Sequence, residues 1–227
     1  MIVQSLIDHI PREGGGCDLS GPLGGRTRTR RRLEQYKNRP DTLVLALPRG
    51  GVPVAYEVAR ALNAPMDIFL VRKLGVPGHE EVAMGAIASG GIRILNDDLI
   101  WQINIPQRII DAVTAREQHE LERRERLYRG DRPVPDIRRK TVIVVDDGLA
   151  TGSTMKAALA ALRQQQPAKL IVAVPTAPPE TCDSLRADAD EVICAVTPDP
   201  FLAVGAWYRG FDQTTDDEVR DLIKRAA

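Results

Sequence analysis

The chain has 227 residues, a length that accommodates one large α/β domain with an elaboration. Lysine plus arginine and aspartate plus glutamate number 31 each, so no excess of charge predicts nucleic acid or an anionic membrane as a partner. No segment reaches the roughly 20 apolar residues of a membrane-spanning helix, and no signal peptide is visible after Met1. We therefore expect a cytoplasmic protein that binds neither nucleic acid nor membrane.

Three cysteines lie at positions 17, 182 and 194, and none has the C-x-x-C spacing of a metal site. We interpret them as reduced thiols, with Cys194 in the core because its neighbours are apolar. Reduced thiols agree with a cytoplasmic location.

Residues 1–40 are expected to form an irregular N-terminal segment, because glycines punctuate it heavily. The remainder, 41–227, is predicted to be one domain. Runs rich in β-branched residues predict core strands at 42–47, 66–71, 142–145, 169–174 and 191–196. The apolar pattern predicts helices at 52–62, 106–127, 153–165, 178–185 and 216–224. Strands that alternate with helices favour a doubly wound α/β fold with a mainly parallel five-stranded sheet.

The first predicted strand ends in a turn that contains Arg49, Gly50 and Gly51. Glycines let backbone N–H groups approach a ligand closely, and an arginine can bind a phosphate through two N–H groups. The turn is therefore a candidate diphosphate site. The alternative is that the glycines only allow a tight turn and that Arg49 is an exposed side chain without a ligand.

A polar stretch with glycines and a proline, 72–81, follows the second strand and is predicted to be a mobile lid. Arg72 and Lys73 open this stretch and would supply cations to a diphosphate. A catalytic role and an exposed loop tip are both open alternatives for His79, Glu80 and Glu81.

Residues 82–139 are predicted to be an insertion between the two halves of the sheet. It would contain a hairpin of strands 82–87 and 92–95, followed by the long charged helix 106–127. We expect a homodimer, with this insertion as a candidate contact.

The strand at 142–145 leads into Asp146 and Asp147, which fall at its carboxyl end, where open parallel sheets bind ligands. The loop 150–154 and the helix that begins there offer backbone N–H groups, hydroxyls and a helix dipole to an anion. A phosphate loop beside two carboxylates suits a sugar phosphate, with the carboxylates holding its hydroxyls directly or through a metal. The alternative is an ordinary strand–turn–helix with an acidic loop.

These motifs resemble those of the type I phosphoribosyltransferases, which use 5-phosphoribosyl-1-pyrophosphate (PRPP). The acidic pair and 150–154 are similar to the PRPP loop, in the variant with alanine before Thr-Gly that adenine enzymes carry. Arg49-Gly50-Gly51 is similar to the pyrophosphate loop of xanthine-type enzymes. Arg72-Lys73 is similar to the start of the catalytic loop in adenine and orotate enzymes. The tail 200–208 resembles the hood of hypoxanthine-type enzymes, where an aromatic ring stacks on the base.

The resemblance implies a magnesium-dependent phosphoribosyltransferase of nucleotide salvage, which moves the phosphoribosyl group of PRPP to a nucleobase-like nitrogen and releases pyrophosphate. The implied catalytic residues are Arg49, Lys73, Asp146 and Asp147. The two aspartates would also bind Mg²⁺, directly or through ribose hydroxyls or water. The implied PRPP contacts are Gly50, Gly51, Arg72, Ala150, Thr151, Gly152, Ser153 and Thr154. Either an aromatic ring of the tail stacks on the base, or both rings pack the C-terminus; the two candidates are Trp207 and Tyr208.

Hypoxanthine-type enzymes carry an aspartate at the position of Ala150 and a lysine before the hood, and this chain has neither. The acceptor is therefore left unassigned. A regulator that senses PRPP or a nucleotide without turnover is the alternative function. A sugar-phosphate hydrolase is disfavoured because no aspartate lies two residues after Asp146. A P-loop nucleotidase is excluded because no Gly-Lys-Ser/Thr follows the glycine loop.

Overall fold

The computed structural model of the chain describes residues 33–208 and 210–226. A sheet of five parallel strands forms the centre, in the order β2-β1-β6-β7-β8. The bounds of these strands are Thr42–Ala46 (β1), Met66–Ile68 (β2), Thr141–Val145 (β6), Lys169–Thr176 (β7) and Glu191–Val196 (β8). The predicted five-stranded parallel sheet is thus confirmed. Strand β2 is shorter than predicted because the chain leaves the sheet at Phe69.

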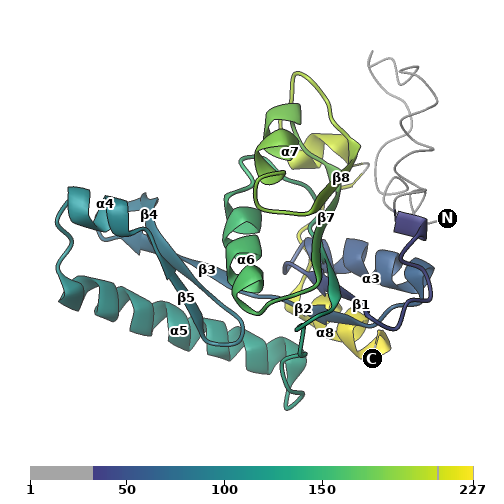
Figure 1. Ribbon diagram of the computed structural model, residues 1–227, viewed down its shortest axis with the longest axis horizontal. Coiled ribbons are helices and arrows are strands. Elements are labelled where there is room, and N and C mark those ends of the chain that lie inside the picture. Colours follow the sequence, from purple (N-terminus) through teal and green to yellow (C-terminus); the bar gives the residue numbers. More distant parts are fainter. Residues whose placement is uncertain (1–32, 209, 227) are drawn as a thin grey trace.

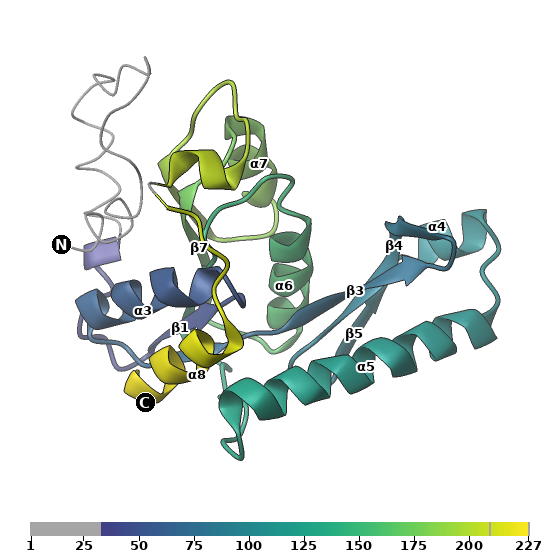
Figure 2. The same cartoon turned by 180° about the vertical axis from the view of Figure 1, so that it is seen from behind.

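Alternate residues of each strand enter two separate cores. Val44 and Ile143 pack on one face with α3 and α8, whereas Leu43 and Val142 pack on the other with α6 and α7. The helices run Gly51–Leu62 (α3), Ser153–Gln164 (α6), Pro179–Leu185 (α7) and Asp216–Arg225 (α8). Figures 1 and 2 show the two helix pairs on opposite faces of the sheet. Both faces are therefore covered, as the continuous apolar strands require.

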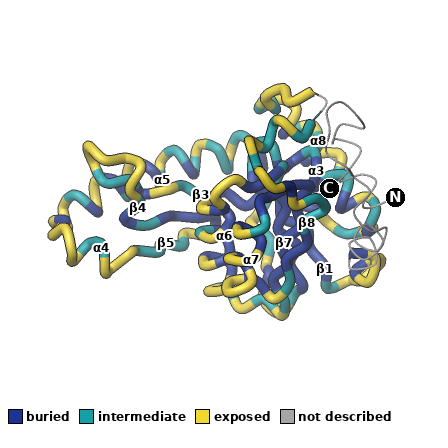
Figure 3. Tube along the Cα trace, turned by 90° about the horizontal axis from the view of Figure 1, so that it is seen from above, coloured by how far each residue is buried: buried dark blue, intermediate teal, exposed yellow. Residues whose placement is uncertain are grey.

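An arm extends away from this sheet (Figure 1). It consists of β3 (Val71–Val76), β4 (His79–Ala88), β5 (Ile92–Leu95), α4 (Asp97–Gln102) and α5 (Gln107–Arg129). Its strands form a separate antiparallel sheet in the order β3-β4-β5, which packs on α5. Figure 3 shows that buried positions are densest in the five-stranded sheet and continue into the arm along its strands. The predicted hairpin and long helix of the insertion are both found.

The predicted lid at 72–81 is wrong in one respect, because most of this stretch is paired β-structure. Strands β3 and β4 pair from Val71 opposite Ala88 to Val76 opposite His79, around a turn that contains Gly78 at φ +80°. Leu74 on β3 is fully buried in the same core as residues of α5. The arm therefore begins at residue 71 rather than at 82, because β3 belongs to its sheet.

The interpretation of the cysteines as reduced thiols is corrected for Cys182 and Cys194, whereas Cys17 lies outside the described residues. Cys182 on α7 and Cys194 on β8 form a disulfide, with their Cα atoms 6.9 Å apart. They meet because α7 packs on the strand that follows it, and a separation of twelve residues gave no such signal in the sequence. The cysteines therefore lend no support to the expected cytoplasmic location. Among the described residues, every helix is too short or too polar to cross a lipid bilayer.

A buried ion pair joins the end of α5 to β2 at the root of the arm. Arg129 is 3% exposed and Asp67 is 12% exposed, and Arg129 Nε lies 3.2 Å from Asp67 Oδ1. The guanidinium also donates to the carbonyl of Ile68 at 2.9 Å. Removal of one partner of such a pair leaves an uncompensated buried charge.

We expect Arg129→Met to lower the free energy of unfolding by about 3–5 kcal/mol, because Asp67 would remain buried without its cation. Arg186→Met is the matched control, since Arg186 is 56% exposed and pairs with Asp183 within one helix turn. We expect that control to change stability by less than about 1 kcal/mol. Urea unfolding of the three proteins measures both values. Equal losses in the two variants would contradict the importance of the buried pair.

Candidate active site

The turn after β1 and the acidic pair after β6 lie side by side at the carboxyl edge of the sheet. Their strands are hydrogen-bonded neighbours, and Leu47 N donates to the carbonyl of Val145 at 2.9 Å. A Cβ added at Gly50 would lie 1.8 Å from Asp147 Oδ2, and one added at Gly51 would lie 2.7 Å from the Val145 carbonyl oxygen. The two glycines are therefore needed for the turn to touch the acidic strand end.

The two aspartates form an electrostatically unfavourable pair. Burial, followed by the charge of Asp147, raises the pKa of Asp146 well above its usual range. Burial also raises the pKa of Asp147. A hydrogen bond from the Asp147 backbone N–H to Asp146 Oδ1, at 2.9 Å, offsets part of this effect. Two partly enclosed carboxylates of this kind favour a cation or hydroxyl donors as ligands.

The predicted phosphate loop adjoins the acidic pair and begins α6. Gly152 has a φ of +70°, and a Cβ there would lie 2.9 Å from Thr181 Cγ2, so both backbone conformation and space require glycine. Thr151, Ser153 and Thr154 are exposed, and the N-cap residue of α6, Gly152, has no side chain to cap the helix. Thr151 Oγ1 accepts one long hydrogen bond from Ser153 N, at 3.4 Å. The loop thus presents hydroxyls and backbone N–H groups to an anion. The α7 residue Thr181 supports it by donating to the Ala150 carbonyl at 2.7 Å.

The aromatic tail closes over the acidic strand end. Tyr208 donates its hydroxyl to the backbone carbonyl of Asp147, and its ring centroid lies 5.1 Å from that of Phe211. Trp207, in the short helix η1 (Val204–Trp207), has an enclosed indole N–H for which the described residues offer no acceptor. Tyr208 is therefore held by the site's backbone rather than free, while Phe211 is half exposed.

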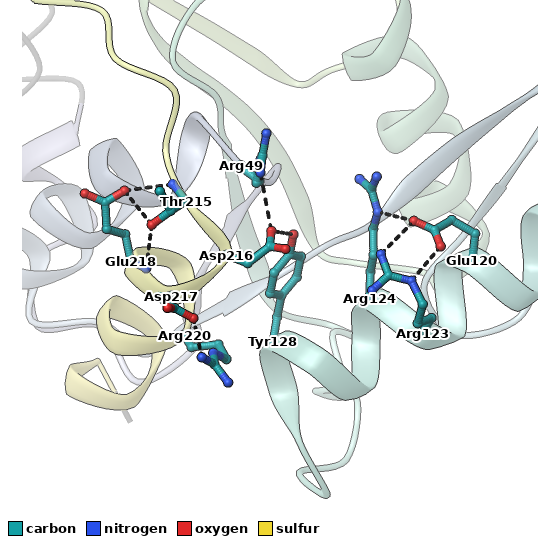
Figure 4. A network of polar contacts seen from close by, with 10 residues as sticks. All are labelled: Arg49, Glu120, Arg123, Arg124, Tyr128, Thr215, Asp216, Asp217, Glu218 and Arg220. Carbon is teal, nitrogen blue, oxygen red and sulfur yellow. Dashed lines mark hydrogen bonds and ion pairs between the residues drawn. The ribbon is translucent and has the colours of Figure 1, made fainter.

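Arg49 extends from the glycine turn and remains about one-third exposed. Its Nη1 lies 3.5 Å from Oδ1 of Asp216, the first residue of α8 (Figure 4). An ion pair at this distance occupies only part of the guanidinium and leaves other N–H groups for a ligand.

The two predicted cations of the lid bond to the arm instead. Arg72 donates through Nε to Glu117 Oε2 on α5 at 2.7 Å, and Glu117 is 8% exposed. Lys73 Nζ donates to the Glu81 carbonyl at 3.3 Å. Arg72 and Arg116 together supply the cations that compensate the buried carboxylate of Glu117. In this structure neither side chain joins Arg49 at the acidic pair.

Four features of the site were not anticipated: Thr181, Phe211, Asp216 and the Tyr208 contact with the Asp147 backbone. Each reaches the site from a distant segment, and none stands in a local motif. Phe211 lies just beyond the predicted tail 200–208, and its aromatic ring was the signal in the sequence that could have indicated it.

The two glycines are expected to respond differently to alanine. Gly51→Ala would press its Cβ against backbone atoms of Val145 and Asp146, which cannot rotate away, and we expect a loss of about 1–3 kcal/mol in unfolding free energy. Gly50→Ala meets the Asp147 side chain, so we expect displacement of that carboxylate with a smaller loss. Gly210→Ala, with open space around its Cβ, is the control. Urea unfolding and a crystal structure of each variant test this, and equal losses at 50 and 51 would contradict it.

The raised pKa of Asp146 predicts a pH-dependent stability. Both folded and unfolded chains are protonated at low pH, and the folded state loses stability as the pH rises above about 4 through the raised pKa. We therefore expect Asp146→Asn to be more stable than the wild type at pH 8, with the gain disappearing near pH 3. Asp131→Asn, at an exposed position, is the control. A gain that is equal at both pH values would contradict ionisation of Asp146 as the cause.

Comparison with known proteins places this geometry in a family. Residues 26–206 match the phosphoribosyl transferase domain family. Two relatives from Mycobacterium tuberculosis, of strains H37Rv and CDC 1551, are provisionally named phosphoribosyl transferases. Each is 46% identical over 196 residues, which cover 86% of this chain and 44% of the relative. The chain thus spans less than half the length of these relatives.

Among solved structures, the protein TT1426 from Thermus thermophilus is 39% identical to this chain. The match has a TM-score of 0.78 and covers 89% of this chain and 95% of TT1426. The arm and the five-stranded sheet therefore recur together in a relative of similar extent. On the family match and on these relatives, the chain belongs to the phosphoribosyl transferase family.

Proposed function

We propose that this chain is a phosphoribosyltransferase that transfers the 5-phosphoribosyl group of PRPP to a nitrogen of a nucleobase or a related acceptor. A C1–N bond forms as the C1–O bond to pyrophosphate breaks. The bonding electron pair leaves on pyrophosphate, and the acceptor's N–H proton passes to solvent. Membership of the family supports transfer in general, and the site supports the donor.

The observation that carries the proposal is the contact of the Gly50–Gly51 turn with Asp147, beside the loop 150–154. Three kinds of group lie at one edge of the sheet: an arginine beside backbone N–H groups, two carboxylates, and the start of a helix whose N-cap is a glycine. PRPP carries a diphosphate, ribose hydroxyls and a 5-phosphate, one chemical partner for each of these groups. Each of the three protein groups suits a different part of PRPP. Their combination therefore indicates PRPP more specifically than any one of them does alone.

Different residues would bind different parts of the donor PRPP. Arg49, Gly50 and Gly51 would bind the diphosphate, the acidic pair would hold the ribose hydroxyls, and the loop 150–154 would hold the 5-phosphate. Because charge develops on the sugar and on the leaving group, these fixed groups act by positioning and electrostatics rather than by a covalent nucleophile. Tyr208 fixes the backbone of Asp147 and thereby limits how far the pair can move.

The acidic pair also fits the magnesium ion that the family implies. The described residues contain no cluster of three or more candidate ligands, so the protein would contribute Asp146 and Asp147 while substrate oxygens and water complete the shell. Magnesium commonly binds in this way, through one or two carboxylates and phosphate oxygens. Bound there, it would neutralise charge on the diphosphate.

The acceptor side rests on the aromatic tail. Phe211 is half exposed beside Tyr208, and a flat apolar surface of this kind suits a planar ring. Ala150 leaves no carboxylate at the position where hypoxanthine-type enzymes carry one. We therefore propose a nucleobase-like acceptor without assigning its identity. The expected homodimer and cytoplasmic location remain predictions from the sequence.

A sensor of PRPP or a nucleotide is the second candidate, and the arm supplies the observation that favours it. Arg72 and Lys73 bond to Glu117 and to the Glu81 carbonyl, so the predicted lid cations serve the fold of the arm. A site without these cations would bind a sugar phosphate but stabilise a leaving diphosphate less.

Release of pyrophosphate from PRPP and Mg²⁺, measured across a panel of purine and pyrimidine bases, tests the proposal. We expect release with at least one base, and a loss of about 100-fold or more in kcat/KM for Asp147→Ala, because the ribose hydroxyls would lose one of the two carboxylates that hold them. Asp188→Ala, at an exposed position, is the control. Calorimetry measures PRPP binding in parallel. Unchanged PRPP binding by Asp147→Ala would contradict the role of the acidic pair, and binding without release for every base would favour the sensor.

A further inference from the structure

A polar network connects Arg49 to the helices α5 and α8. Asp216, at the start of α8, accepts a hydrogen bond from the Tyr128 hydroxyl on α5 at 2.6 Å, and the same oxygen lies 3.5 Å from Arg49 Nη1. Figure 4 shows the carboxylate between the tyrosine and the arginine. The turn after β1, the C-terminal helix and the arm helix therefore meet at one oxygen atom.

The position of Asp216 is itself well determined. Thr215 and Glu218 form a capping box that fixes the first turn of α8, with Glu218 N donating to Thr215 Oγ1 at 3.2 Å. Tyr128 is only 5% exposed, next to Arg129 in its buried pair with Asp67. Both supports of the carboxylate are thus anchored in the fold.

The network restricts an arginine that would otherwise be free to move. Arg49 lies in the turn between β1 and α3 and is about one-third exposed, and a long arginine side chain has many rotamers. The hydrogen bond from Tyr128, followed by the charge of Arg49, lowers the pKa of Asp216, so the carboxylate stays ionised at neutral pH. An ionised partner that is fixed on one side of Arg49 selects the rotamers that lie near it.

We propose that Asp216 is a positioning residue that holds the Arg49 guanidinium for the diphosphate of the substrate, with Tyr128 orienting the carboxylate. This inference rests on the proposed function, because it takes the Arg49 turn as the diphosphate site. Asp216 touches neither the sugar nor the acceptor in this scheme and acts through Arg49 alone. The C-terminal helix thereby becomes part of the donor site.

Asp216 has two opposite effects on diphosphate binding, so the direction of the change in Kd tests the proposal. Through Arg49 the carboxylate assists binding, whereas directly its negative charge repels the ligand. Removal of Asp216 should therefore weaken binding when Arg49 is present. When Arg49 is absent, only the repulsion remains, and removal of Asp216 should leave binding unchanged or strengthen it.

The experiment measures the Kd of inorganic pyrophosphate with Mg²⁺ by calorimetry for the full chain. The variants are Asp216→Ala, Arg49→Met and the double variant. We expect Asp216→Ala to raise Kd about two- to fivefold in the wild-type background, the range of a partly exposed ion pair. We expect no increase when it is added to Arg49→Met. Tyr128→Phe should raise Kd in the same direction as Asp216→Ala and by less.

Asp217→Ala is the matched control, because Asp217 lies one residue further along α8 and pairs with Arg220 rather than with Arg49. It removes the same charge from the same helix start and should leave Kd unchanged. Thermal unfolding of each variant verifies that α8 remains folded. An equal increase in Kd from Asp217→Ala would show a general effect of the helix and overturn the proposal.

The remaining outcomes separate this proposal from the proposed function. If Arg49→Met binds pyrophosphate as tightly as the wild type, the diphosphate turn and the positioning role are both wrong. If Arg49→Met weakens binding and Asp216→Ala does not, only the positioning role is wrong. Tighter binding by Asp216→Ala in the wild-type background would show that Asp216 competes with the diphosphate for Arg49. An equal loss in both backgrounds would show a structural role only.

Discussion

The close approach of the glycine turn to the acidic strand end is the constraint on which the rest of the site depends. Neighbouring parallel strands bring the two segments to one edge, and the missing side chains at Gly50 and Gly51 let them touch. The contact makes the turn and the acidic pair one rigid unit. A ligand that binds both the turn and the acidic pair must therefore span a fixed distance between them. Such a constraint lets a fold select one substrate by its shape before a second substrate is present.

The same contact creates an electrostatic difficulty. Asp146 and Asp147 lie close together and partly enclosed, and the pKa of each is raised. The folded chain is consequently less stable with both groups ionised than a chain with a neutral residue at one position would be. A site that is unfavourable when empty gains more from a cation or from hydroxyl donors than a relaxed site would. Under the proposed function, stability is exchanged for affinity at this edge, as functional sites commonly show.

Sequence patterns predicted the parts of the molecule in which neighbours along the chain determine the structure. Strand β8 occupies the predicted residues, and β1 differs by one residue, because a buried parallel strand reads as a short apolar run. The positions of the acidic pair and of the loop 150–154 were also predictable, since a strand, its end and the next helix are contiguous. Asp216 reaches Arg49 from the far end of the chain, and Cys182 meets Cys194 across a helix–strand packing, so no local pattern announces either contact.

Arg72 and Lys73 show why a sequence motif predicts which residue types are present better than it predicts where their side chains point. Adjacent residues of a paired strand point to opposite faces, so the side chains of Arg72 and Lys73 leave β3 on opposite sides. Arg72 lies on the face toward α5, where it pairs with the buried Glu117. A joint role for the two residues at the diphosphate would therefore require the Arg72–Glu117 pair to break.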